Sequence, residues 1–160
     1  MAIAFFSTWT TYGTWLPGDW RGFRQHGRPE KGAIARWEFE ARFRMTGTAV
    51  LLNQVQRNIV EETVANHCVH RAWELHAVSC RSNHVHAILT APDRDLKIPR
   101  EQFMAWCTRK LKEHERTVSG FQTVRECWWT ERGWDEYLDT DEDFDHAMEY
   151  VLEGQDFGFC

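Results

Sequence analysis

RSNHVHAILTAP, residues 81–92, decides the fold of this chain, because it holds the turn and the second strand of a predicted β-hairpin. WELHAVSC (73–80) is the first strand, and HVHAILTAP (84–92) is the second, which Pro92 stops. The three residues between them, Arg81 to Asn83, have the length of a hairpin loop. The segment therefore predicts two adjacent antiparallel strands.

The two histidines of this stretch, His84 and His86, are two residues apart in a strand, so their side chains share one face of the sheet while Val85 points to the other. Neighbouring imidazoles suit a protein core poorly, since each ring nitrogen needs a polar partner. They suit the binding of one metal ion well. The other reading of the pair is two exposed or hydrogen-bonded structural histidines.

Outward from the hairpin, strand-favouring residues and apolar residues at helical spacing predict the remaining elements. The order gives an α+β fold: a ferredoxin-like β-α-β-β-α-β core with an antiparallel sheet, an additional C-terminal helix and a long N-terminal loop insertion. The expected elements are a strand at 5–13, the loop at 14–35 with room for a short hairpin, helices at 51–71 and 100–117, a strand at 128–138 and a helix at 141–153.

Composition and charge set the outer limits of the function. With 160 residues, we expect a single domain, 1–160. Five cysteines without a C-x-x-C pair indicate reduced thiols, and no apolar run is long enough to span a membrane, so we expect a cytoplasmic protein. Residues 1–120 hold 17 Lys and Arg against 12 Asp and Glu, whereas residues 121–160 hold 2 against 12. The net charge of −5 therefore does not argue against a local nucleic-acid surface.

SNHVHAILTAP resembles the HUH motif (histidine, hydrophobic residue, histidine) of single-strand DNA nucleases and transposases. In the single-tyrosine members this motif lies on a strand of a ferredoxin-like sheet, and a tyrosine follows on a late helix. DHAMEYVLEGQD (145–156) supplies Tyr150 in that place. The order of elements and WTTYGTWLPGD near the start extend the resemblance over most of the chain, which looks most like the insertion-sequence and REP-associated tyrosine transposases.

The resemblance implies the chemistry of the site. Tyr150 would be the catalytic nucleophile, and a divalent ion, Mg²⁺ or Mn²⁺, would be held by His84, His86 and a third side chain. The family commonly places that third ligand four residues after the tyrosine, where this chain has Gly154. We expect Gln155 to take the role, with Glu153 as the alternative. The implied reaction cleaves and rejoins single-stranded DNA near hairpins through a 5′-phosphotyrosine intermediate.

Two regions carry residues suited to DNA contact. In the 14–35 loop, tryptophan and arginine side chains could stack on bases or bind phosphates; a solvated loop is the other reading. On the second helix, basic side chains line much of one side and could guide a hairpin stem. The predicted DNA-binding residues are Trp15, Trp20, Arg21, Arg24 and Arg28 in the loop and Arg109, Lys110 and Lys112 on the helix, with Arg116 on the same basic side.

Other readings stay open at this point. One is a non-catalytic nucleic-acid-binding protein on the same fold, either a binding module or a domesticated or decayed transposase. Another is a zinc protein that uses His67, Cys68, His70 and Cys80, although no C-x-x-C spacing supports it. Tyr12 and Tyr137 are the remaining tyrosines, which we expect to pack or to contact substrate. The family includes dimers that share tyrosines across subunits and members that act as monomers, and of the two we expect a homodimer.

Overall fold

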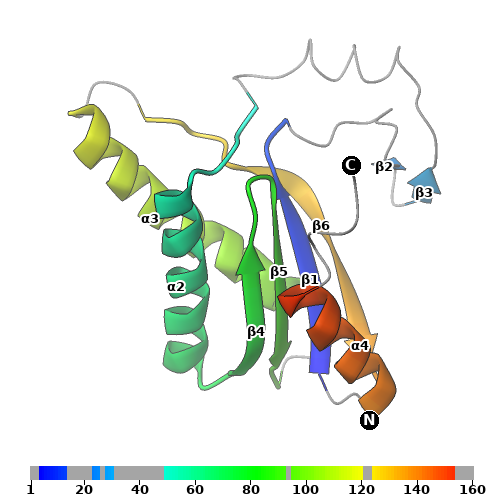
Figure 1. Cartoon of the computed structure of the whole chain (residues 1–160). Helices are drawn as coiled ribbons and strands as arrows, with labels where there is room; N and C mark the ends of the chain where they lie inside the picture. The colour runs from blue at the N-terminus through cyan, green and yellow to red at the C-terminus, as the bar shows by residue number, and fades with distance from the viewer. Residues whose placement is uncertain are drawn as a thin grey trace.

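In a computed structural model, four long strands form an antiparallel sheet in the order β4-β5-β1-β6 (Figure 1). The structure describes residues 4–13, 23–25, 28–30, 49–92, 95–120 and 124–153, with only the backbone for 23–25, 28–30 and Arg132. The elements are β1 (Ala4–Thr11), β2 (Phe23–Gln25), β3 (Arg28–Glu30), α2 (Gln54–Arg71), β4 (Glu74–Cys80), β5 (His84–Thr90), α3 (Lys97–Ser119), β6 (Trp129–Leu138) and α4 (Asp141–Leu152).

This order confirms the predicted ferredoxin-like core and its additional C-terminal helix. The strands β1, β4, β5 and β6 are the four strands of the core, and α2 and α3 are the two crossover helices. Within the 14–35 loop, β2 and β3 pair antiparallel as the short hairpin for which the sequence left room. Among the described residues, no helix is long and apolar enough to cross a membrane.

Helix α2 begins where the sequence places a capping box. The Asn53 side chain accepts a hydrogen bond from the Gln56 backbone N–H at 2.9 Å, and the Gln56 side chain accepts one from the Asn53 N–H at 2.9 Å. These bonds satisfy two donors that the first helical turn leaves without partners. The helix ends at Ala72, which adopts a left-handed conformation with φ of 54°.

Helix α3 begins at Lys97, three residues before the predicted start at 100. The prediction treated Pro99 as a residue that must precede the helix. Proline is tolerated in the first turn, however, because the N–H that it lacks has no partner within the helix there. Pro99 is buried in that first turn, so the prediction of this boundary was wrong.

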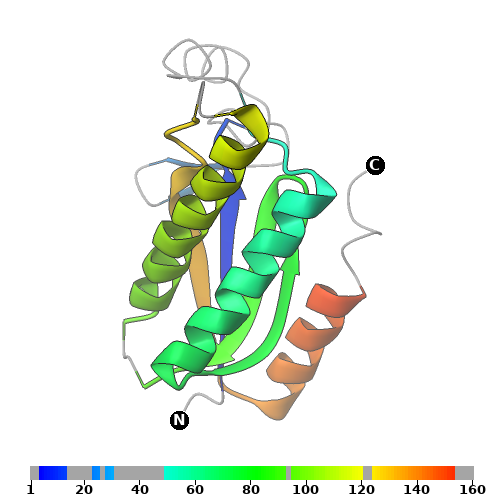
Figure 2. The same ribbon diagram turned by 90° about the vertical axis from the view of Figure 1, so that its left-hand side faces the viewer.

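The helices cover the sheet unequally. Figure 2 shows α2 and α3 side by side in front of the sheet and α4 on its far side. The main core lies under α2 and α3, where the fully buried Trp9 packs against Phe103 and Trp129 with ring centroids 5.9 and 6.3 Å apart. The core under α4 is smaller, and its buried members are Ala4, Ala77, Ile88, Leu138 and Val151.

A buried ion pair joins α3 to the β1–β6 edge of the sheet. Arg100 Nε lies 3.1 Å from Asp135 Oδ2, and Ser7 Oγ donates a hydrogen bond to Asp135 Oδ1 at 2.6 Å. Gly133 lies directly beside this pair: a Cβ at that position would collide with the Arg100 side chain and with the Thr8 carbonyl oxygen. The β1–β6 register shifts next to Gly133.

Candidate active site

His84 and His86 lie on the α4 side of the sheet, on one strand and one face. The register pairs Thr10 with His84 and Thr8 with His86, so two threonines of β1 flank the two histidines. The ring centroids of His84 and His86 are 4.7 Å apart. Val85, between them, is fully buried in the core under α2 and α3. The alternation that predicted a shared face for the two imidazoles is therefore confirmed.

Both imidazoles are held through Nδ1. His84 Nδ1 lies 2.7 Å from the side-chain oxygen of Asn83, and His86 Nδ1 lies 2.7 Å from Thr8 Oγ1. The Asn83 oxygen can only accept, so His84 Nδ1 carries the proton and Nε2 presents its lone pair. Metal-binding histidines are held in this way, with one nitrogen bonded to an oxygen and the other directed at the ion. The donor set therefore fits a divalent metal.

His86 is almost fully enclosed, with 6% of its surface exposed. Burial, reinforced by the nearby His84 and Arg81, lowers the pKa of His86 to about 3. An imidazole with so low a pKa is neutral at physiological pH, and the neutral form is the one that binds metal.

Helix α4 brings Tyr150 to the histidines. Thr140 caps its start by accepting a hydrogen bond from the Asp143 N–H at 3.1 Å, and three acidic residues in the first turn favour the helix dipole. The Tyr150 and His86 ring centroids are 5.4 Å apart, and the Phe6 ring contacts both residues. The Tyr150 side chain remains 45% exposed, so it lies beside the histidines and is open to a ligand.

The third metal ligand is not settled by the described residues. They contain no group of three or more His, Cys, Asp or Glu side chains that could hold a metal, so Glu153 does not join the two histidines here. Glu153 is the exposed C-cap of α4, which ends at Leu152. Gln155, the expected ligand, and Gly154 lie outside the described residues.

A cleft of about 400 Å³ opens beside Tyr150. Tyr137 of β6 and His146, one helical turn before Tyr150, line it together with the Tyr150 ring. The rest of its wall holds three carboxylates, Glu136, Asp139 and Asp143, and three apolar side chains, Phe6, Leu138 and Ala147. Tyr12, by contrast, packs against the core under α2 and α3. Tyr150 is thus the tyrosine whose ring contacts His86, and Tyr137 lines the same cleft as Tyr150.

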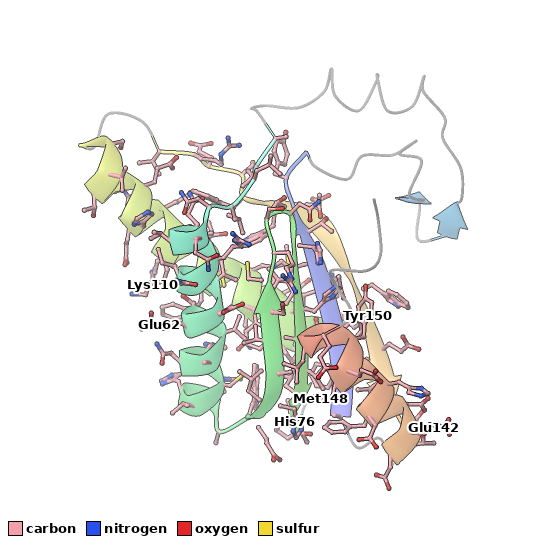
Figure 3. The ribbon with its side chains drawn as sticks, viewed as in Figure 1. Glu62, His76, Lys110, Glu142, Met148 and Tyr150 are labelled. Carbon is pink, nitrogen blue, oxygen red and sulfur yellow. The ribbon has the colours of Figure 1, made fainter. Side chains whose placement is uncertain are left out.

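The predicted DNA-binding residues do not meet at this site. On α3, Arg109 stacks on Trp106 at 4.9 Å, and Lys110 lies 3.3 Å from Glu113. Figure 3 shows Lys110 on the side of the sheet that α2 and α3 cover and Tyr150 on the side that α4 covers. Of the loop residues, Trp15, Trp20 and Arg21 lie outside the described residues, and Arg24 and Arg28 are described by their backbone alone.

The four residues of the zinc alternative do not gather into a metal site within the described chain. His67 bonds to Gln102 at 2.8 Å and helps to line a cleft of about 560 Å³ between α2 and α3, on the side of the sheet away from Tyr150. Burial raises the pKa of Cys68 to about 11 and, with the Glu61 carboxylate, that of Cys80 to about 12. Protonated, buried thiols are poor metal ligands, so Cys68 and Cys80 pack in the core rather than bind a metal.

Sequence reasoning missed Thr8 and Phe6, the two β1 residues that contact the histidine and the tyrosine. The alternation in FFSTWTT does place Phe6, Thr8 and Thr10 on one face. It does not tell which strand pairs with β1, nor in which register. The sequence therefore shows that Phe6 and Thr8 share a face of β1, but it does not show that this face lies beside His86 and Tyr150.

Comparison with known proteins shows the fold. No family model matches this chain, and no curated protein matches its sequence. Solved structures that share the fold include a REP-associated tyrosine transposase bound to a REP hairpin, at 15% identity and a TM-score of 0.53, covering 94% of this chain and 67% of that one. Another is described as a transposase from Deinococcus radiodurans R1 by proposal, at 10% identity and a TM-score of 0.52, covering 94% of this chain and 89% of that one. The chain therefore has a transposase-like fold.

Proposed function

We propose that this protein is a divalent-metal-dependent tyrosine transposase that cleaves and rejoins single-stranded DNA near hairpins. One observation carries the proposal: a tyrosine on α4 contacts a histidine pair on β5, with the Tyr150 and His86 rings 5.4 Å apart. The two residues are 64 positions apart in the sequence, and the sheet and helix bring them together. The hairpin in the solved relative of this fold supports the choice of substrate.

In this reaction the Tyr150 Oη attacks the scissile phosphorus and forms a phosphotyrosine bond to the 5′-phosphate of the downstream strand. The bond from phosphorus to the 3′ oxygen breaks, and that strand leaves with a free 3′-hydroxyl. The Tyr150 proton passes to a neighbouring base, for which His146 is a candidate in the same cleft. Attack by a second 3′-hydroxyl reverses the step and restores a phosphodiester, so the reaction needs no ATP.

The metal is proposed to be Mg²⁺ or Mn²⁺ held by His84 and His86, with Gln155 as the proposed third ligand and Glu153 as its alternative. When bound, such an ion polarises the phosphate and stabilises the charge that develops on its oxygens. Imidazole with one oxygen ligand suits Mn²⁺ better than Mg²⁺. The basic residues Arg109, Lys110 and Lys112 are proposed to attract a hairpin stem rather than the scissile phosphate, because α3 covers the opposite side of the sheet.

A covalent-adduct assay tests the proposal. The protein is incubated with a pool of single-stranded DNA hairpins and Mn²⁺ or Mg²⁺, and a denaturing gel reports a protein–DNA adduct. We expect a metal-dependent adduct that Tyr150→Phe and His84→Ala both abolish. Tyr137→Phe is the matched control, since Tyr137 lines the same cleft and is similarly exposed. An adduct that persists in Tyr150→Phe would contradict the assignment of the nucleophile.

A second candidate is a non-catalytic nucleic-acid-binding protein, domesticated or decayed, on the same fold. One observation favours it: three carboxylates line the cleft beside Tyr150, where they would repel a scissile phosphate. It predicts tight hairpin binding without an adduct under any metal. The same gel, run beside a binding assay, separates the two functions.

The protein is also proposed to act as a homodimer. Light scattering at working concentration tests this, and a particle of 19.0 kDa would contradict it.

A further inference from the structure

Trp134 of β6 lies on the same face of the sheet as the histidines. The register pairs Thr8 with His86 on one side and with Trp134 on the other. The three residues therefore form a row across β5, β1 and β6, whose neighbouring strands run side by side (Figure 1). With strands about 4.8 Å apart, the backbones of His86 and Trp134 are about 10 Å from each other.

Trp134 is unusually exposed for its size. Among the six tryptophans whose side chains the structure describes, four are buried and two are not: Trp134, with 47% of its surface exposed, and Trp106, with 40%. Trp106 lies on α3 and carries the Arg109 guanidinium against its ring. A half-exposed indole on a strand, beside a row of threonine and histidine, is accessible to a ligand.

The surrounding charge selects the kind of ligand. Residues 121–160, which include β6 and α4, hold 2 Lys and Arg against 12 Asp and Glu, so these elements offer few cationic side chains to bind phosphates beyond the proposed metal site. A nucleobase is neutral and has a π-face, and aromatic side chains bind unpaired bases by stacking. Stacking is the contact that an acidic surface still permits.

We infer that Trp134 is a base-binding residue, on which an unpaired base next to the scissile phosphate stacks. The inference rests on the proposed function, because it takes the phosphate to lie at His84, His86 and Tyr150. It adds a reason for single-stranded DNA as substrate: a paired base in a duplex does not present its face to a side chain. It also predicts that the Trp134 contribution does not depend on salt, unlike that of phosphate contacts.

The experiment measures binding without turnover. Full-length protein with Tyr150→Phe, in chelator, is titrated into fluorescein-labelled single-stranded DNA of mixed sequence, and anisotropy gives the affinity. Trp134→Ala should weaken binding about 5- to 150-fold. The loss should be equal at about 50 and about 200 mM salt. Trp134→Phe should keep most of the affinity, since a phenyl ring also stacks. Val69→Ala is the control, an exposed apolar residue of α2 on the opposite side of the sheet, and should bind as the parent does.

The outcomes are distinguishable. Affinity of Trp134→Ala within about twofold of the parent overturns the inference, as does an equal loss in Val69→Ala. A large fall in melting temperature with unchanged affinity would show that the indole packs within the protein instead. If Trp134→Ala loses affinity while wild-type protein never forms an adduct, the base contact stands and the proposed catalytic function fails. If adducts form but Trp134→Ala binds normally, only the base contact is wrong.

Discussion

At the scale of single residues, Thr8 is expected to position His86 for metal. Thr8→Val keeps the shape of the side chain but removes the oxygen that holds His86 Nδ1. Loss of such a partner typically lowers metal affinity about 10- to 100-fold. Calorimetric titration of Mn²⁺ into the protein measures this directly, without any assay of DNA cleavage.

Thr10→Val is the control for that change. Thr10 is on the same strand and face, pairs with His84 in the register and bonds to Thr130 at 2.8 Å. Its substitution should leave Mn²⁺ affinity close to that of wild type. Equal affinities in wild type, Thr8→Val and Thr10→Val would show that the Thr8 hydroxyl does not orient the ligand.

Cysteine reactivity should follow burial. Cys127 is exposed, whereas Cys68, Cys80 and Cys107 are buried, and burial raises the pKa of all three. The thiolate is the reactive form, so a raised pKa leaves almost none of it near pH 8. Brief treatment of the folded protein with iodoacetamide, followed by peptide mass mapping, should label Cys127 before these three. Early labelling of Cys80, whose pKa is about 12, would contradict the structure.

At the scale of elements, α4 is expected to be the least firmly attached helix. Val151 is its buried residue and belongs to the small core under the helix. Val151→Ala should lower the free energy of unfolding by about 1–3 kcal/mol, because it leaves a cavity in that core. Leu152→Ala, one residue later and 58% exposed, should change it by less than about 0.5 kcal/mol. Urea denaturation of both variants decides whether Val151 anchors the helix.

The elements themselves were largely predictable. Periodicity located α2 but placed its start at 51, whereas the helix begins at Gln54, after the capping box of Asn53 and Gln56. The start of α3 was not predictable from the same rules, because Pro99 fits equally well just before a helix and inside its first turn. The two-residue spacing in HVH gave the shared face of the histidines. No local pattern could give the contact between Thr8 and His86, which depends on strand pairing across 78 residues.

At the scale of the whole molecule, the Arg100–Asp135 pair is expected to hold α3 against the sheet. Both side chains are buried, so removing one partner leaves an uncompensated charge in the interior. Asp135→Ala should lower the free energy of unfolding by about 3–5 kcal/mol. Glu101→Ala, which breaks the exposed pair of Lys97 and Glu101, should cost no more than about 1 kcal/mol. Similar midpoints for these two variants in urea would show that the buried pair is not needed.

The arrangement of the whole site could be predicted only with the family resemblance. From the residues alone, Tyr150 reads as a helix aromatic and the histidines as a possible metal pair, with nothing to connect them. Their proximity arises because the chain folds α4 back over β5, and that requires the small core under α4 to form. The third ligand could not be fixed by either route, since it depends on how the chain continues beyond Glu153.

The close approach at Gly133 has a consequence for how such sequences evolve. Because a Cβ at this position would collide with the Arg100 side chain and with the Thr8 carbonyl oxygen, a relative with a larger residue there must have lost or shortened its arginine and moved this part of β6 away from β1. The aspartate at position 135 would then have no reason to persist. The three positions should therefore covary as a unit, and finding them together would help to recognise distant members whose overall identity is too low to align with confidence.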